Sequence, residues 1–148
     1  MDGDAILRET ERYFHEMIPM TRAMGVQVAA LDDEGLVLTA PLEANHNHLG
    51  TAFGGSLSAI ATLAGYGMLW LELGERDAHV VVRQSEIDYF HPVRGEIRSI
   101  CRRPSAIEME DFKARFGRSG KARIDLRVTV EEEGRVCAAF EGTFVALK

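Results

Sequence analysis

Cysteine is scarce in this chain, and its scarcity excludes a scaffold held together by disulfides. Cys101 and Cys137 are the only two in 148 residues, and each lies in a strand-like segment beside apolar residues. Small secreted domains carry much denser cysteine frameworks. The stretch from Met1 to Arg12 is charged and has no apolar run of the kind found in secretory signals. We therefore expect a cytoplasmic protein with two free, structural thiols.

Basic residues are also in the minority. Seventeen Lys and Arg stand against 23 Asp and Glu, which gives a formal net charge of −6 and a pI near 5.4. An acidic surface repels a phosphate backbone, so nucleic acid is not an expected partner. Hydrophobic residues make up 46% of the chain and charged residues 27%, a balance that excludes disorder. The length is that of one domain, so residues 1–148 are expected to fold as a single unit.

Charge is absent altogether from Leu57–Leu71, inside the longer segment Ser56–Gly74. A helix that is apolar on all sides is buried, either in a protein core or in a membrane. A membrane span needs about 20 apolar residues, whereas this run is shorter, contains Gly65 and Gly67, and is followed by Glu72. The segment therefore predicts a core helix and no membrane span. Something must pack very close to its two glycines, because each one weakens an isolated helix.

Alternating apolar residues elsewhere predict strands, and helical spacing predicts two further helices. The expected strands cover 24–31, 36–40, 79–91, 96–103, 121–131 and 135–147; the expected helices cover 4–17, capped by Asp4 and stopped by Pro19, and 108–116. Six strands with tight connections form an antiparallel sheet, and the apolar helix must be its core. The expected class is α+β. One small sheet covers only one side of that helix and leaves open edges, so we expect a homodimer or a dimer of dimers.

The loop before the apolar helix is dense in Asn, His and Gly, and it ends in Gly54-Gly55. Glycines at the start of a helix let a ligand approach the backbone, and the first amides of the helix carry partial positive charge. Such amides can stabilise a developing oxyanion, and the N–H of Gly55 is the candidate donor. The alternative is that the two glycines merely make a tight turn into a helix capped by Ser56.

An ordered series of short motifs runs through this region and beyond it. On the loop and the helix they are Asn45-x-Asn47, Gly50-Thr51-x-Phe53-x-Gly55-Ser56-Leu57, Ala61-Thr62-Leu63 and Gly65-Tyr66-Gly67; further along are Ile87-Asp88-Tyr89 with Pro92, Gly120-Lys121-Ala122-Arg123 and Phe140-Glu141-Gly142-Thr143. In order and spacing, this series resembles the YiiD-type C-terminal thioesterase domain of the hotdog superfamily. The resemblance covers 18–147 and implies hotdog-fold dimers or higher assemblies. It also implies acyl-CoA or acyl-carrier-protein thioesters of fatty acid metabolism as substrates, hydrolysed without a cofactor.

The wider superfamily supplies expectations for individual residues. Many relatives carry an asparagine and then His-Gly-Gly before the helix, and an Asp or Glu on its second turn. In this chain Asn47 matches the asparagine and Gly54-Gly55 match the two glycines. Phe53 stands in place of the histidine, and Thr62 stands in place of the acid. A threonine hydroxyl is too weak a base to deprotonate water. We therefore expect Asn47 and Thr62 to align a water while Gly55 stabilises the oxyanion. Further residues expected to bind substrate are Asn45, Phe53, Gly54 and Ser56, together with Gln84 and Ser85 reaching in from a second subunit.

Other interpretations of the same residues stay open. His46 and His48 alternate in the loop, but two ligands do not make a zinc site, so no metal is expected. A hotdog dehydratase needs a proton-transferring His paired with an acid, and no Asp precedes Asn45-His46-Asn47-His48. The missing general base favours an alternative to hydrolysis, which is a non-catalytic protein that binds or senses acyl thioesters. Arg83 and Arg94 are candidate contacts to the phosphates of coenzyme A.

Overall fold

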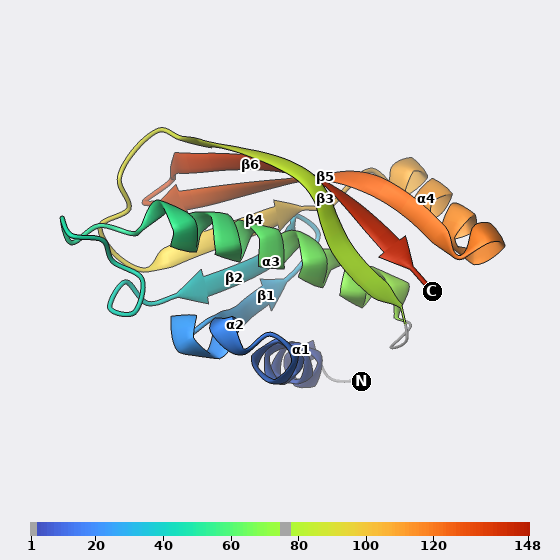
Figure 1. The fold of residues 1–148 in the computed structure, drawn as a ribbon, viewed down its shortest axis with the longest axis horizontal. Coiled ribbons are helices and arrows are strands. Elements are labelled where there is room, and N and C mark those ends of the chain that lie inside the picture. Colours follow the sequence, from blue (N-terminus) through green and yellow to red (C-terminus); the bar gives the residue numbers. More distant parts are fainter. Residues whose placement is uncertain (1–2, 75–77) are drawn as a thin grey trace.

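The centre of the molecule is a helix surrounded on one side by a curved sheet (Figure 1). The computed structural model describes residues 3–74 and 78–148. Within them the elements are, in chain order, α1 (Gly3–Met17), α2 (Pro19–Met24), β1 (Gln27–Leu31), β2 (Gly35–Ala40), α3 (Gly54–Leu73), β3 (His79–Tyr89), β4 (Ile97–Arg102), α4 (Ala106–Ser119), β5 (Lys121–Glu132) and β6 (Arg135–Leu147). This arrangement confirms the predicted α+β class and the hotdog architecture.

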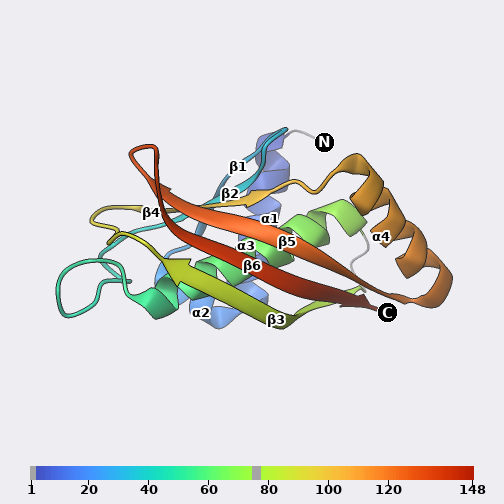
Figure 2. The same ribbon diagram turned by 90° about the horizontal axis from the view of Figure 1, so that it is seen from above.

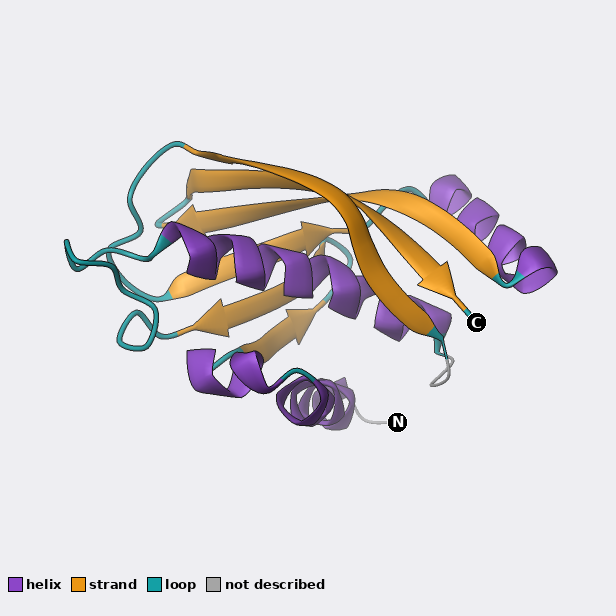
Figure 3. Ribbon diagram, viewed as in Figure 1, coloured by secondary structure: helices purple, strands orange, loops and turns teal. Residues whose placement is uncertain are grey.

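The six described strands form one antiparallel sheet in the order β1-β2-β4-β5-β6-β3. The long strands β5 and β6 curve over α3 (Figures 1 and 3). Along β5 every second residue is buried, as the sequence pattern predicts, because successive side chains point to opposite faces of a strand. The two edges of the sheet are β1 and β3, and α1 packs against the first of them. There Glu11 on α1 accepts a hydrogen bond from the amide of Val28 at 2.9 Å.

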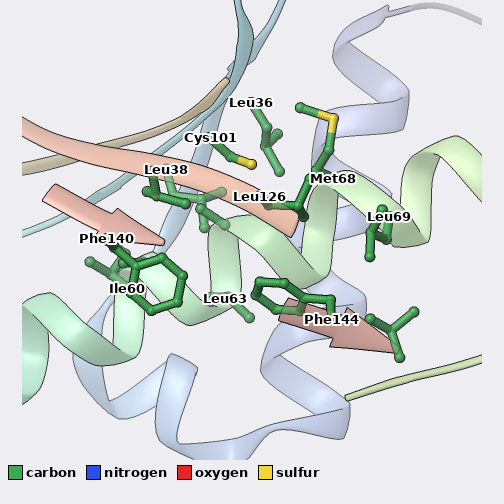
Figure 4. Close-up of a cluster of buried hydrophobic side chains, with 14 of the residues drawn as sticks. Leu36, Leu38, Ile60, Leu63, Met68, Leu69, Cys101, Leu126, Phe140 and Phe144 are labelled. Carbon is green, nitrogen blue, oxygen red and sulfur yellow. The ribbon is translucent and has the colours of Figure 1, made fainter. Parts of the chain in front are cut away.

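The predicted core helix is confirmed as α3 (Figure 4). It is long and apolar enough to cross a membrane by length and composition, with a mean hydropathy of 1.2, but it lies inside the sheet. Ile60, Met68 and Leu69 on this helix are fully buried. The predicted close approach at the glycines is also present. A side chain at Gly65 would collide with the ring of Phe144, and one at Gly67 would lie 2.7 Å from the ring of Phe14.

The N-terminal region differs from the sequence prediction in one respect. Pro19 ends α1 as expected, but it also begins a second short helix, α2, which occupies residues predicted as loop and strand start. Proline is favoured at the first position of a helix, because the N–H that it lacks would have no helical partner. Gly25 then ends α2 in the left-handed conformation, and the strand begins only at Gln27. Asp4 likewise lies in the first turn of α1 and not before it.

Both cysteines are free and buried, as predicted. Burial raises the pKa of the Cys101 thiol to about 12, because the charged thiolate loses its hydration. Cys137 lies on β6 and is fully buried. Neither thiol is placed to act as a nucleophile.

Candidate functional site

The start of α3 presents two free backbone amides. Phe53 is the N-cap, and its carbonyl accepts hydrogen bonds from the amides of Ser56 at 2.9 Å and Leu57 at 3.1 Å. The preceding amides, those of Gly54 and Gly55, donate to no group of residues 3–74 and 78–148. This is the expected condition of the first turn of a helix. The structure thus keeps the predicted donor at Gly55 available and corrects the alternative in which Ser56 caps the helix.

Two asparagines hold the loop that leads into α3. Asn45 is buried, and its Nδ2 donates to the carbonyls of Met24 and Pro41, both at 2.8 Å. The backbone carbonyl of Asn45 accepts a hydrogen bond from the amide of Phe53 at 2.7 Å. Asn45 therefore supports the helix start from beneath, and the substrate contact expected from the sequence stays a prediction.

Asn47 closes the tip of the same loop. Its Oδ1 accepts from the amide of Leu49 at 2.9 Å and from Thr51, while its Nδ2 donates to the Thr51 hydroxyl at 3.0 Å. The amide side chain is thus engaged within the loop at both of its polar atoms. Asn47 thus shapes the loop, and its expected role in aligning a water stays a prediction.

Aromatic side chains cover the helix start, and the sequence indicated only one of them. A side chain at Gly55 would lie 2.6 Å from the ring of Phe53, so this ring lies over that glycine. The ring of Tyr89, at the end of β3, lies beside Gly54, and its hydroxyl donates to the Gly54 carbonyl at 3.2 Å. Phe53 and Tyr89 are 56% and 51% exposed, which marks this end of the molecule as an open apolar surface. Tyr89 is 35 residues away in sequence, and only strand pairing brings it here.

A cavity of about 540 Å³ runs along the exposed side of α3. The N-terminal helices form one wall with Met17, Met20 and Met24. The other wall is formed by α3, with Ala59, Thr62 and Tyr66. The unbranched, polarisable side chain of methionine adapts to flexible apolar ligands. Ala59 lies in the cavity as predicted for an acyl-binding face, but Ala61 and Gly65 are buried against the sheet.

The polar groups of this cavity are few. The Thr62 hydroxyl donates to the carbonyl of Ser58 at 2.8 Å, which leaves its oxygen able only to accept. The hydroxyls of Tyr66 and Tyr13 lie 3.2 Å apart. Burial and this neighbouring hydroxyl raise the pKa of Tyr66, so its phenol stays protonated at neutral pH. Among the described residues, no carboxylate lines the cavity.

Gln84 and Ser85 are not brought to the helix start within one chain. They lie in the middle of β3 and line a shallow cavity of about 250 Å³ with acidic residues of β5 and β6. Four residues of strand, about 13 Å, separate Ser85 from Tyr89. Nearer the site, His46 contacts its own loop through Nδ1 and the carbonyl of Asn47 at 2.9 Å. In the part of the chain that the structure describes, no three His, Cys, Asp or Glu side chains gather as metal ligands.

Comparison with known proteins agrees with this architecture. The structure resembles a protein of unknown function from Chlorobaculum tepidum, with a TM-score of 0.90 and 35% identity over 99% of this chain and 96% of the other. It also resembles a structure described as a "putative thioesterase" from Shewanella oneidensis, with a TM-score of 0.84 and 30% identity over 98% of this chain and 99% of the other. A thioesterase from Haemophilus influenzae shares the fold, with a TM-score of 0.70 at 16% identity over 96% of this chain and 90% of the other. The family model "Putative thioesterase (yiiD_Cterm)" matches residues 7–148. This chain therefore belongs to the YiiD C-terminal thioesterase family, in the hotdog fold that its sequence predicts.

Proposed function

We propose that this protein hydrolyses acyl thioesters of coenzyme A or of an acyl-carrier protein, using the first amides of α3 as the oxyanion site. The observation that carries this proposal is that Gly55 and the α3 residues of the apolar cavity lie along one face of the helix. Gly55, Ala59, Thr62 and Tyr66 follow one another at helical spacing and share one face of α3. Eleven residues of helix, about 16 Å, lead from Gly55 to Tyr66. An acyl chain lying along this face would have its carbonyl at Gly55.

The proposed reaction needs little from side chains. Water attacks the carbonyl carbon, and the carbonyl oxygen becomes an oxyanion at the Gly54 and Gly55 amides. The carbonyl then re-forms as the C–S bond breaks. The sulfur leaves as a thiol with one proton of the water, and the acyl carbon keeps the hydroxyl as a carboxylic acid. Thr62 can accept a hydrogen bond from water because its own proton is donated to the Ser58 carbonyl. It lies seven residues, about 10 Å, along α3 from Gly55, so we assign it an orienting role toward water in the cavity and no contact with a carbonyl at Gly55. Asn47 is assigned a positioning role through the loop that it closes.

We further propose that the active unit is a homodimer paired through β3. This strand is an edge of the sheet with exposed apolar side chains, including Val81 at 49%, Val82 at 40% and Tyr89 at 51%. Two copies paired antiparallel would place the start of one β3 beside the end of the other. Gln84 and Ser85 of both copies would then lie side by side at the middle of the paired strands, about 13 Å from each Tyr89. Light scattering of the purified protein should give twice the mass of one chain. The variant Val82→Lys should shift the measured mass toward that of a single chain. A monomeric wild type would exclude the dimer.

The experiment that tests the function is thiol release from a panel of acyl thioesters. Acyl-CoAs of increasing chain length, and matched acyl-carrier proteins, would be incubated with the wild-type protein in the presence of a thiol reagent. We expect release above background, with a preference for apolar chains that fill the cavity beside Ala59. No release from any member would refute hydrolysis.

The absence of a carboxylate among the described residues of the cavity favours one second candidate, a protein that binds acyl thioesters without cleaving them. Tight binding of the same panel with no thiol release would support it. We also propose a reducing, cytoplasmic compartment, because both thiols are free and buried.

A further inference from the structure

The outer end of the sheet carries a basic pocket on an otherwise acidic chain. The end of α4 lies near the starts of β3 and β5 and the end of β6 (Figures 1 and 2). Residues of these four elements line a cavity of about 780 Å³. Among the described residues, five cationic side chains line it and no acidic one does; the five are Arg83, Arg115, Arg118, Lys121 and Arg123. The chain as a whole has a net charge of −6. The pocket is therefore positively charged although the chain as a whole is negatively charged.

In the part of the chain that the structure describes, most of these cations have no acidic partner. Arg115 forms an ion pair with Asp111 on the preceding turn of α4, at 3.0 Å. Within residues 3–74 and 78–148, Arg83, Arg118, Lys121 and Arg123 have no acidic partner. Unpaired like charges on converging elements repel one another, so the cluster lowers the stability of the free protein. A ligand carrying several negative charges would relieve this repulsion.

The pocket also has an apolar floor. Val81, Val145 and Leu147 lie on neighbouring strands and line it between the cations. Its volume falls in the range of cavities that hold a small molecule, whereas protein partners dock on broader and flatter surfaces. Arginine recognises phosphate with two parallel hydrogen bonds, and an apolar floor suits the face of a base. The chemistry is that of a nucleotide bearing several phosphates.

We infer that this pocket binds the 3′-phosphorylated adenosine diphosphate end of coenzyme A, and that acyl-CoA rather than acyl-carrier protein is the substrate. The inference rests on the proposed hydrolysis. Within one chain the pocket and Gly55 lie at opposite ends of the fold, since β3 runs from one to the other. In the proposed dimer, antiparallel pairing brings the partner's pocket to the end of β3 where Tyr89 contacts Gly54. Lys121 and Arg123 alternate with the buried Ala122 and Ile124, so the pocket opens on the face of the sheet away from α3. The pantetheine arm would pass around the end of β3 to reach the amides of α3.

Direct binding of the nucleotide tests the inference independently of turnover. Adenosine 3′,5′-bisphosphate and coenzyme A would be titrated into the wild-type protein by calorimetry. The double variant Arg118→Gln/Arg123→Gln should bind both at least about tenfold more weakly, because two charged hydrogen-bond donors to phosphate are lost. Arg12→Gln/Arg98→Gln is the matched control. It makes the same change in charge at two exposed arginines outside the pocket and should bind as the wild type does.

Kinetics separate this inference from the proposed reaction. The double variant Arg118→Gln/Arg123→Gln should have a KM for an acyl-CoA about tenfold higher, with kcat unchanged. The matching N-acetylcysteamine thioester has no nucleotide, so the variant should hydrolyse it as the wild type does. Nucleotide binding without hydrolysis would support the pocket and refute the reaction. Wild-type protein that fails to bind the bisphosphate, equal binding by the pocket and control variants, or binding of acyl-carrier protein alone would overturn the inference.

Discussion

Replacing Gly55 by proline is expected to lower kcat for thioester hydrolysis by about 100-fold or more. One preformed donor to an oxyanion contributes about 3–4 kcal/mol to transition-state stabilisation, and proline removes the N–H without removing the helix. Gly55 is the second residue of α3, where the amide has no partner within the helix. The loss should therefore fall on kcat and leave the melting temperature nearly unchanged. Thiol-release kinetics and thermal unfolding of the same samples measure the two effects.

Gly55→Ala is the matched control, because alanine displaces the same neighbour and keeps the amide. A Cβ at this position meets the Phe53 ring at 2.6 Å. This ring is 56% exposed and free to turn away. Gly54→Pro removes the adjacent amide at the first helical position, where proline is favoured and the N-cap ψ of 133° already suits it. Equal activity of Gly55→Pro and Gly55→Ala would remove the Gly55 amide from the mechanism.

Replacing Phe144 by alanine is expected to lower the free energy of unfolding by about 3–5 kcal/mol, the usual cost of deleting a buried aromatic ring. Phe144 is 1% exposed, lies against α3 at Gly65, and is 6.4 Å from the ring centre of Phe140. Phe144 lies among the buried side chains of the core (Figure 4), so its removal would leave a cavity there. Urea unfolding followed by circular dichroism measures the change. A loss below about 1 kcal/mol would contradict the packing described here, because that is typical of a surface substitution.

Gly65→Ala provides a second measurement of the same contact. Alanine favours a helix over glycine by about 1 kcal/mol, but a Cβ here would lie 2.7 Å from the Cε1 atom of Phe144. Overpacking of this kind costs about 1–3 kcal/mol, so the variant should be less stable than the wild type. Combining it with Phe144→Leu, which shortens the ring side chain, should recover part of the loss. Additive effects of the two substitutions would show that these residues do not share the contact.

Much of this fold could be predicted from local patterns. The uncharged run Leu57–Leu71 has to be buried wherever it lies, and the alternation along β5 requires one covered face. The position of Gly54-Gly55 before that run locates the helix start, and with it the free amides. Helix boundaries were less accurate, because α2 begins with the same Pro19 that ends α1.

The roles of individual site residues could not be predicted in the same way. Asn45 and Asn47 occupy neighbouring positions in one loop, yet one is buried beneath the helix and the other closes the loop tip. A sequence shows that a side chain is polar, but not which backbone groups its fold leaves without partners. Hydrogen bonds to such groups decided both placements.

The sequence by itself determined the layers of this protein, because hydrophobic periodicity acts over a few residues and fixes which face of each element must be buried. Tertiary structure alone decided what surrounds the site. The contact of Tyr89 with Gly54, the methionine wall beside Thr62, and the basic pocket around Arg118 and Arg123 each join elements distant in the chain. Strand order and register set those contacts, and a shift of one residue would turn every side chain of a strand to its other face.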